Sequence, residues 1–315
     1  MYEPSVMVYL MTGFLDSGKT QFLNFTLKQD YFQIDGKTLL ILCEDGEEEY
    51  DPMEMLKYGV VIERVEEQED LTEEWLEEMD RKHNPERVIV EYNGMWKVSD
   101  FENLKLPAGW GIEQKLTTVD ASTFQMYLTN LKPLFVEMVK GSEMVLFNRC
   151  EDIKPLAGYR RSVKVVSPQA EVIFEDENGE VENIFEDDVP YDLKAPVIEI
   201  QKEDYGIWYV DMMENPDRYK GKVIEFTAKV MKPRTFPSKV FLPGRMAMTC
   251  CADDMSFLGY VCRSSYAPKL KPGDWVKIRA KVGFANVSIY RGEGPVLEAE
   301  HIEPAEPIEE LVYFN

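Results

Sequence analysis

The sequence contains few cysteines and histidines and no hydrophobic run long enough to cross a bilayer. A transmembrane helix needs about 20 consecutive apolar residues, and the longest uncharged apolar stretches here are far shorter. The 5 cysteines are sparse and odd in number, which favours reduced thiols over a disulfide framework. The acidic start, Met1 to Pro4, lacks the basic region of a signal peptide. These absences predict a cytoplasmic protein with no membrane insertion.

Basic residues are also scarce, and they are unevenly distributed. Asp and Glu outnumber Lys and Arg by 58 to 35, which gives a net charge of -23. Residues 1–204 hold 20 basic and 44 acidic residues, whereas residues 205–315 hold 15 and 14. This change in composition predicts two domains, at 1–185 and 205–315, joined by an acidic linker at 186–204. The last 24 residues are an acidic tail, with 7 acidic and no basic residues.

Residues 13–20 form a complete G-x-x-x-x-G-K-[ST] phosphate loop (P-loop) after an apolar run, Val6 to Met11, that predicts a buried strand. In such a loop, backbone N–H groups converge on a phosphate, Lys19 reaches the β- and γ-phosphate oxygens, and the Thr20 hydroxyl holds Mg²⁺. The apolar residues that follow are typical of a helix start. The predicted nucleotide-binding residues of this segment are Gly13, Asp16, Ser17, Gly18, Lys19, Thr20 and Gln21.

The first 185 residues alternate short apolar runs with amphipathic helical stretches. The runs are typical of strands covered on both faces: Thr38 to Cys43, Arg87 to Glu91, Leu116 to Asp120, and Met144 to Asn148. Residues 71–82 and 121–139 have helical spacing of their apolar residues. This pattern predicts an α/β domain with a mostly parallel sheet.

Two strand ends carry candidate functional residues. Asn148, Arg149 and Glu151 stand where GTPases place Asn-Lys-x-Asp, whose amide and carboxylate recognise guanine. Arg149 would lay its aliphatic stem and cationic plane on the base. The second strand end carries Glu91 and, three residues later, the flexible Gly94. This places an acid where it could contact a γ-phosphate or a metal-bound water. The alternative for both segments is a strand-end turn with solvated side chains.

The chain resembles the CobW-type family (CobW/HypB/UreG-like) of P-loop GTPases, which are metallochaperone-like, over roughly residues 5–175. The resemblance rests on five segments in the family's order: 13–20, 43–51, 90–94, 118–121 and 148–151. It implies that Glu44, Glu47 and Asp51 lie near metal in a nucleotide-responsive switch. The family's Cys-x-Cys-Cys is missing, and the remaining oxygen-rich cluster suits Mg²⁺ or Mn²⁺ better than Zn²⁺. The alternative for most of these acids is a solvated loop.

The C-terminal part predicts a small all-β, OB-like barrel, with strands at 221–230, around 275–282 and at 295–302. It resembles the C-terminal domain of a permease-associated bacterial family. Cys250, Cys251 and Asp253 are candidate metal ligands, for which Zn²⁺ is the favoured ion. The alternative is that one cysteine is a core residue and the other is partly exposed.

Together these features predict a slow GTPase that acts as a switch in metal handling or metalloprotein maturation. Lys19, Thr20 and Glu91 are its predicted catalytic residues, because phosphoryl transfer needs mainly positioning and charge neutralisation. The expected cofactors are GTP and Mg²⁺, with Zn²⁺ as a further candidate, and the expected partner is a metal-dependent client protein or a transporter. Two alternatives stay open: a GTP-sensing scaffold with little turnover, and an OB-type nucleic-acid-binding module, which the acidic first domain disfavours.

Overall fold

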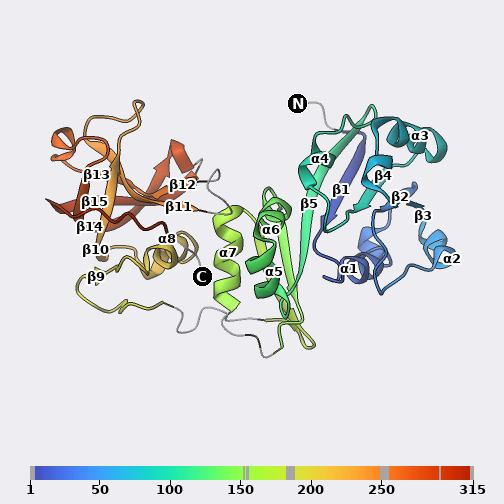
Figure 1. Ribbon diagram of the computed structural model, residues 1–315, viewed down its shortest axis with the longest axis horizontal. Coiled ribbons are helices and arrows are strands. Elements are labelled where there is room, and N and C mark those ends of the chain that lie inside the picture. Colours follow the sequence, from blue (N-terminus) through green and yellow to red (C-terminus); the bar gives the residue numbers. More distant parts are fainter. Residues whose placement is uncertain are drawn as a thin grey trace. The chain divides into compact units, whose positions relative to one another are not determined.

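The computed structural model describes residues 4–151, 153, 156–181, 189–248, 255–290 and 292–312. The chain divides into two compact units, Met1–Ile184 and Phe185–Asn315 (Figure 1). In the described ranges, no helix is long and apolar enough to cross a membrane.

The first unit is built on an eight-stranded sheet that is parallel except for its last strand. In sheet order, the strands are β3 (Val60–Arg64), β2 (Thr38–Leu42), β4 (Arg87–Glu91), β1 (Val6–Thr12), β5 (Trp110–Asp120), β6 (Met144–Asn148), β7 (Glu171–Asp176) and β8 (Gly179–Glu180). The predicted α/β class with a mostly parallel sheet is confirmed. Because parallel strands end at a common edge, the segments that follow β1, β2, β4, β5 and β6 meet there.

Helices cover both faces of this sheet, which explains why its central strands are apolar throughout. Alternate residues of β2 face opposite sides: Leu39 packs in one hydrophobic core, and Leu40 packs in the other. The helices of the unit are α1 (Lys19–Thr26), α2 (Pro52–Met55), α3 (Glu73–His83), α4 (Val98–Glu102), α5 (Phe124–Asn130), α6 (Lys132–Val139) and α7 (Leu156–Val166). Residues of α1 and α2 belong to one core, and residues of α3 to α7 belong to the other.

The helical stretch predicted at 121–139 is two helices in the structure, not one. The chain leaves the helical conformation at Leu131, where φ is -129° and ψ is 32°. Pro133 lies in the first turn of α6, where its missing N–H is tolerated, whereas a continuous helix would need that N–H as a donor. The proline therefore starts a second helix.

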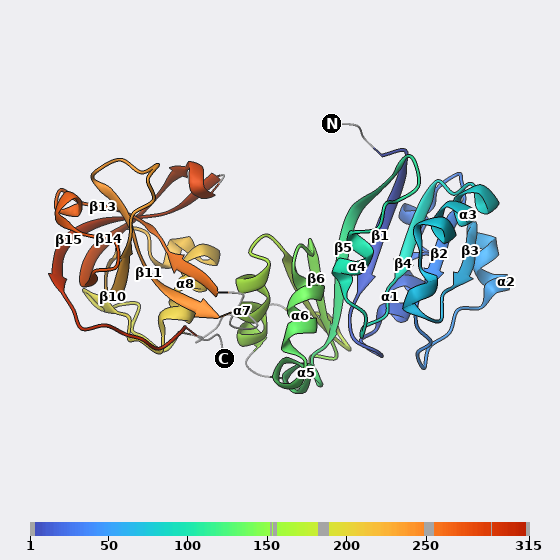
Figure 2. The ribbon, with the colours of Figure 1, turned by 45° about the horizontal axis from the view of Figure 1, so that its top comes forward.

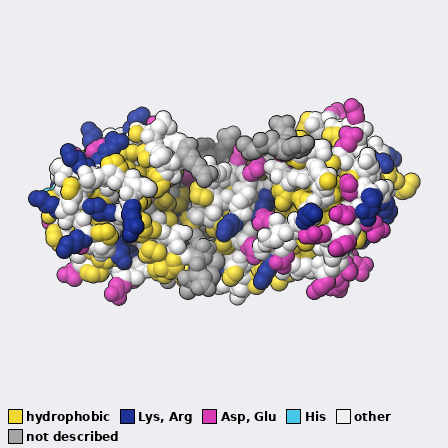
Figure 3. Space-filling view, turned by 90° about the horizontal axis from the view of Figure 1, so that it is seen from above, with side chains coloured by type: hydrophobic (Ala, Val, Ile, Leu, Met, Phe, Trp, Pro, Cys, Tyr) yellow, Lys and Arg dark blue, Asp and Glu magenta, His cyan; other side chains and the backbone are white. Residues whose placement is uncertain are grey.

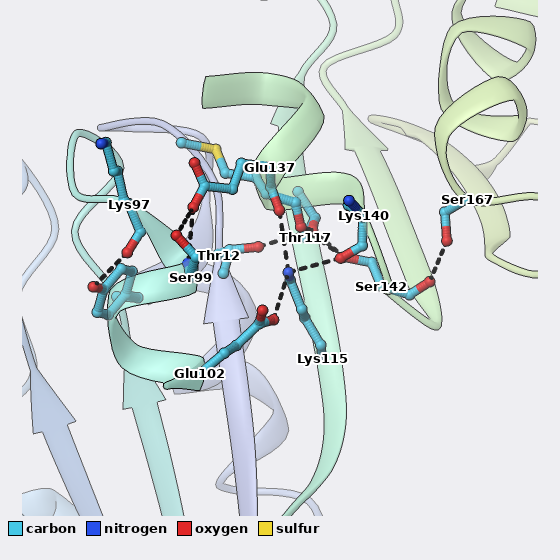
Figure 4. A network of polar contacts seen from close by, with 12 residues as sticks. Thr12, Lys97, Ser99, Glu102, Lys115, Thr117, Glu137, Lys140, Ser142 and Ser167 are labelled. Atoms are coloured by element: carbon cyan, nitrogen blue, oxygen red, sulfur yellow. Dashed lines mark hydrogen bonds and ion pairs between the residues drawn. The ribbon is translucent and has the colours of Figure 1, made fainter. Parts of the chain in front are cut away.

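A polar network joins α4, α6 and β5 in the interior of the first unit (Figure 4). The Lys115 ammonium donates to Glu102 Oε1 at 3.0 Å and to the carbonyl oxygens of Glu137 and Lys140 at 3.2 and 2.8 Å. The Glu137 carboxylate accepts hydrogen bonds from the N–H and hydroxyl of Ser99 at 2.8 and 2.5 Å. Burial lowers the pKa of Lys115, and the nearby Glu102 carboxylate opposes this shift. Lys115 thus satisfies the C-terminal carbonyls of α6.

The second unit is a closed five-stranded barrel (Figure 2). The ring is completed by the pairing of β10 with both β14 and β11, and it confirms the small all-β, OB-like prediction. Its strands are β10 (Val223–Met231), β11 (Val240–Met248), β13 (Val261–Arg263), β15 (Gly292–Pro304) and β14 (Trp275–Val287). A further strand, β12 (Met255–Gly259), pairs antiparallel with β11.

One helix, α8 (Tyr205–Glu214), packs its aromatic side chains into the barrel core. Trp208 is fully buried, with its ring centroid 4.8 Å from that of Phe226 on β10. The preceding strand β9 (Ile198–Glu199) lies in the segment predicted as a linker and pairs with β10. Lys and Arg side chains are frequent on the visible face of this unit, and Asp and Glu on that of the first unit (Figure 3).

Candidate functional site

The candidate site lies where loops from neighbouring parallel strands meet at the carboxyl edge of the first sheet. The P-loop follows β1, an acidic loop at 43–51 follows β2, and a short loop at 92–94 follows β4. A pocket at this edge is lined by Asp16, Gly18, Lys19, Thr20, Gln21, Glu44, Gly46, Glu47, Glu48, Glu91 and Arg149. The structure therefore brings together most of the predicted nucleotide-binding residues and part of the acidic cluster.

Lys19 is buried, and its ammonium contacts three oxygen atoms. Its ammonium donates to the carbonyl oxygens of Gly13 and Phe14, both at 2.9 Å, and forms an ion pair with Glu44. The Lys19 and Glu44 side chains are only 3% and 8% exposed. The other carboxylate oxygen of Glu44 accepts the N–H of Gly94 at 3.0 Å. Glu44 thus holds the ammonium that a P-loop offers to phosphate.

The position of Glu44 also limits the space in the pocket. The cavity measures about 70 Å³, far below the roughly 300 Å³ at the lower end of small-ligand sites. Glu44 lines this small space and occupies the Lys19 ammonium that a phosphate would bind. We refer below to the Glu44–Lys19 pair as the carboxylate latch.

Glu91 links the P-loop to the acidic loop. Its two oxygens accept hydrogen bonds from the Thr20 hydroxyl at 2.5 Å and from the Tyr50 hydroxyl at 2.6 Å. Burial raises the pKa of Glu91, whereas the hydrogen bonds from Thr20 and Tyr50 act to lower it. The sequence indicated Thr20 and Glu91 as site residues, but nothing in it pointed to Tyr50.

Thr20 and Glu91 fit a bound Mg²⁺ ion by their chemistry. Both supply hard oxygen atoms, which Mg²⁺ prefers, and they already lie in contact with each other. The buried carboxylate would supply negative charge beside the hydroxyl. These two residues are therefore the ones that would hold the ion.

Asn148 lies directly over the P-loop. Its Nδ2 donates to the carbonyl oxygen of Ser17 at 2.8 Å, and its Oδ1 is buried without a partner in the part of the chain that the structure describes. A Cβ on Gly18 would lie 2.5 Å from Asn148 Nδ2, and the φ of Gly18 is +93°. The positive φ would strain any residue with a Cβ at this position, which favours glycine. The Oδ1 atom is an unused acceptor, but the protein itself covers it in this structure.

The Arg149 side chain reaches from the end of β6 to the P-loop. Its Nη1 donates to the carbonyl oxygen of Asp16 at 2.9 Å and forms an ion pair with the Asp120 carboxylate at the end of β5. Burial would raise the pKa of Asp120, but the hydrogen bonds from Ser122 and the ion pair with Arg149 lower it overall. Asp120 belongs to a segment that the sequence indicated, although its pairing with Arg149 was not predicted. Glu151, the last predicted nucleotide-binding residue, is exposed to solvent.

The three acids expected near metal have different surroundings. Glu44 and Glu47 line the pocket, and the N–H of Glu47 donates to Asp16 Oδ1 at 3.2 Å. Asp51 instead caps α2, because its carboxylate accepts the N–H groups of Met53 and Glu54 at 2.9 and 3.3 Å. The structure does not bring Asp51 to the lining of the pocket.

Residues 7–174 match the family model described as "CobW/HypB/UreG, nucleotide-binding domain". The chain belongs to this family. Residues 177–314 match a second model, "DUF1980 C-terminal domain". The CobW/HypB/UreG assignment predicted from the sequence is confirmed, and the match covers every residue of the pocket described above.

Two solved structures are similar to this CobW/HypB/UreG-family chain. The hydrogenase maturation factor HypB from Archaeoglobus fulgidus has 16% identity and a TM-score of 0.40, and the match covers 55% of this chain and 83% of that one. The Zn(II)-bound YjiA GTPase from E. coli has 16% identity and a TM-score of 0.43, covering 81% and 88%. No curated protein matches the chain.

The cysteines that the structure describes are not arranged as metal ligands. Cys43, Cys150 and Cys262 are buried, and burial raises the pKa of each thiol, in the case of Cys150 to about 12. Within the described ranges, no three His, Cys, Asp or Glu residues form a group that could hold a metal ion. Cys250, Cys251 and Asp253 lie outside the described residues.

Proposed function

We propose that this CobW/HypB/UreG-family protein binds GTP with Mg²⁺, hydrolyses it slowly, and acts as a switch in metal handling or metalloprotein maturation. The observation that carries the proposal is the pocket that joins the Lys19 ammonium, the Thr20 hydroxyl and the Glu91 carboxylate at the edge of a parallel sheet. Phosphoryl transfer depends on such positioned charges more than on covalent chemistry.

Each residue of the pocket would have a separate task in hydrolysis. Lys19 would neutralise the β- and γ-phosphate oxygens, and the N–H groups of residues 13–20 would hold the phosphates in place. Mg²⁺, when bound, would neutralise developing charge on the same phosphates. Glu91, or an acid of the 44–51 loop, would orient the attacking water or the metal.

The base would be held by the segment at 148–151. The Asn148 amide would contact the edge of guanine, and Arg149 would pack against the ring while Asp120 fixes its guanidinium. Glu151 would accept from guanine N1–H and the exocyclic amine. Because adenine has no such donor pair, GTP should bind more tightly than ATP.

The acidic loop would be the moving part of the switch. A phosphate that binds Lys19 must displace Glu44, and Glu44 belongs to the same loop as Tyr50 and Glu47. Release of the carboxylate latch would therefore change the conformation of residues 44–51. This change is the signal that a metal-dependent client protein or a transporter would recognise.

The function is tested by calorimetry and phosphate release. GTP should bind more tightly than ATP, and phosphate should be released from GTP only with Mg²⁺. Lys19→Ala should abolish hydrolysis and most binding. Lys28→Ala, which lies after the C-terminal end of α1 and is paired with Glu54, should keep both. Equal binding of ATP contradicts the guanine assignment. Tight GTP binding without phosphate release contradicts hydrolysis and favours a GTP-sensing scaffold.

A role in metal transfer would use the second unit. Cys250, Cys251 and Asp253 are proposed as Zn²⁺ ligands, with a fourth position open for transfer. Zinc titration against a chromophoric chelator should show a site in the wild type that the Cys250→Ser/Cys251→Ser double variant lacks. Equal, weak binding by both proteins would leave these cysteines as packing residues.

A further inference from the structure

The second unit contains a pocket that the nucleotide function does not use. Its volume is about 370 Å³, within the range of roughly 300–1,000 Å³ that is usual for small ligands. One wall is the barrel, with Phe226 and Thr227 on β10 and Arg245 on β11. The other wall is the segment 199–203, which leads from β9 to α8. All the lining residues belong to the second unit.

Arg245 is a buried cation at this pocket, with only 2% of its surface exposed. Its Nη1 donates to the carbonyl oxygen of Lys202 at 2.5 Å, and its Nη2 to that of Glu310 at 3.0 Å. The guanidinium carbon lies 5.4 Å from the ring centroid of Tyr205. The Nε atom is buried and has no hydrogen-bond partner among the described residues.

The other cations of the pocket each have a carboxylate partner. Lys277 pairs with Glu225 at 2.6 Å, and Lys202 pairs with Glu310 at 2.9 Å. Arg245 has no carboxylate at ion-pair distance in the part of the chain that the structure covers. The two carbonyl oxygens supply dipoles but no net charge. The Glu310 and Glu203 carboxylates attract this guanidinium from beyond ion-pair distance. A buried charge with no counter-charge in contact still destabilises the folded state, so a bound anion would stabilise Arg245.

We propose that this pocket binds a small organic carboxylate, whose negative charge lies against Arg245 and balances the guanidinium charge. Glu199 and Glu203 also line the pocket, and their charges oppose a polyanion such as a nucleic-acid backbone or a doubly charged phosphate. The size of the cavity and its few apolar lining residues favour a short, polar molecule. This site is independent of the proposed GTPase function.

The test measures ligand binding to the full-length protein by saturation-transfer NMR and calorimetry. The probes are acetate, lactate and glycine, with acetamide as the uncharged analogue of acetate and inorganic phosphate as the competing anion. At least one of the three carboxylates should bind, and should bind more tightly than acetamide and phosphate. Arg245→Gln should weaken the binding of that carboxylate by about tenfold or more, since it removes the positive charge that the carboxylate balances.

Two further variants keep the test decisive if Arg245→Gln does not fold. Thr227→Trp adds bulk at a lining position on β10 and keeps Arg245, and should also abolish binding. Arg263→Gln removes the same charge from β13, where Arg263 pairs with Glu298 at 3.1 Å and neither residue lines the pocket, and should leave the affinity within about twofold. The proposal is overturned if none of the carboxylates binds, if Thr227→Trp keeps the affinity, or if acetamide or phosphate binds as tightly as the carboxylates.

Discussion

The carboxylate latch predicts that removing one charge from the acidic loop tightens nucleotide binding. In Glu44→Gln the side chain keeps its length and can still accept the N–H of Gly94, which it contacts at 3.0 Å. It can no longer form an ion pair with Lys19. The ammonium is then free to bind phosphate without first breaking a buried contact.

The size of the effect follows from the contact that is lost. A hydrogen bond to a charged group contributes about 1.5–3 kcal/mol, and about 1.4 kcal/mol corresponds to a tenfold change in affinity. The Glu44→Gln variant should therefore bind GDP about 10- to 100-fold more tightly than the wild type. The nucleotide-free variant should be less stable, because Lys19, which is 3% exposed, loses its carboxylate partner.

The assay is calorimetry with GDP, performed both in EDTA and with Mg²⁺. The measurement in EDTA tests the carboxylate latch alone, because any contribution of Glu44 to metal binding, which the family resemblance implies, is absent without metal. The matched control is Glu48→Gln, which removes the same charge from an exposed side chain of the same pocket and should change the affinity by less than about 0.5 kcal/mol. An affinity in EDTA that is unchanged or weaker in Glu44→Gln refutes the latch.

Three other substitutions test other parts of the first unit. Tyr50→Phe removes a hydrogen bond that lowers the pKa of Glu91. This pKa, already raised by burial, should rise further, so the acid limb of the pH profile of kcat should move to higher pH. An acid limb that does not move contradicts the role of Tyr50. Lys115→Met should lower the free energy of unfolding in urea by about 2 kcal/mol or more, because buried carbonyl oxygens lose their donor, whereas Lys140→Met, at an exposed position, should change it by less than about 0.5 kcal/mol. Gly94→Ala places a Cβ 2.6 Å from a carbonyl oxygen of the P-loop, so it should cost about 1–3 kcal/mol of stability and weaken GTP binding in calorimetry; normal values for both would show that the clash is relieved.

The edge of the sheet where the pocket forms could be predicted from the sequence, because its determinants are local. The P-loop is recognised from the spacing of Gly13, Gly18 and Lys19, and the strands before it and before Asn148 are recognised from short apolar runs. Parallel pairing then brings their ends together without further information. For the same reason, Glu91 could be placed near Thr20 before any distance was known.

Contacts between distant segments could not be predicted in this way. The Tyr50 hydroxyl reaches a carboxylate 41 positions later in the chain, and a tyrosine in an acidic loop gives no sign of such a partner. Asp51 did carry a local signal, since an Asp before Pro52 is typical of a helix N-cap. That signal favoured the capping role that the structure shows over a role near metal.

The carboxylate latch also has a kinetic consequence. With Glu44 on Lys19, the P-loop offers an approaching nucleotide little net positive charge, and the surrounding domain is strongly acidic. Long-range attraction, which usually accelerates the encounter of an anion with its site, is then replaced by repulsion. Nucleotide association should be slow, and it should become faster as salt screens this repulsion over about 10 Å at 0.1 M. At high nucleotide concentration, the observed association rate should reach a plateau that equals the rate at which the carboxylate latch opens.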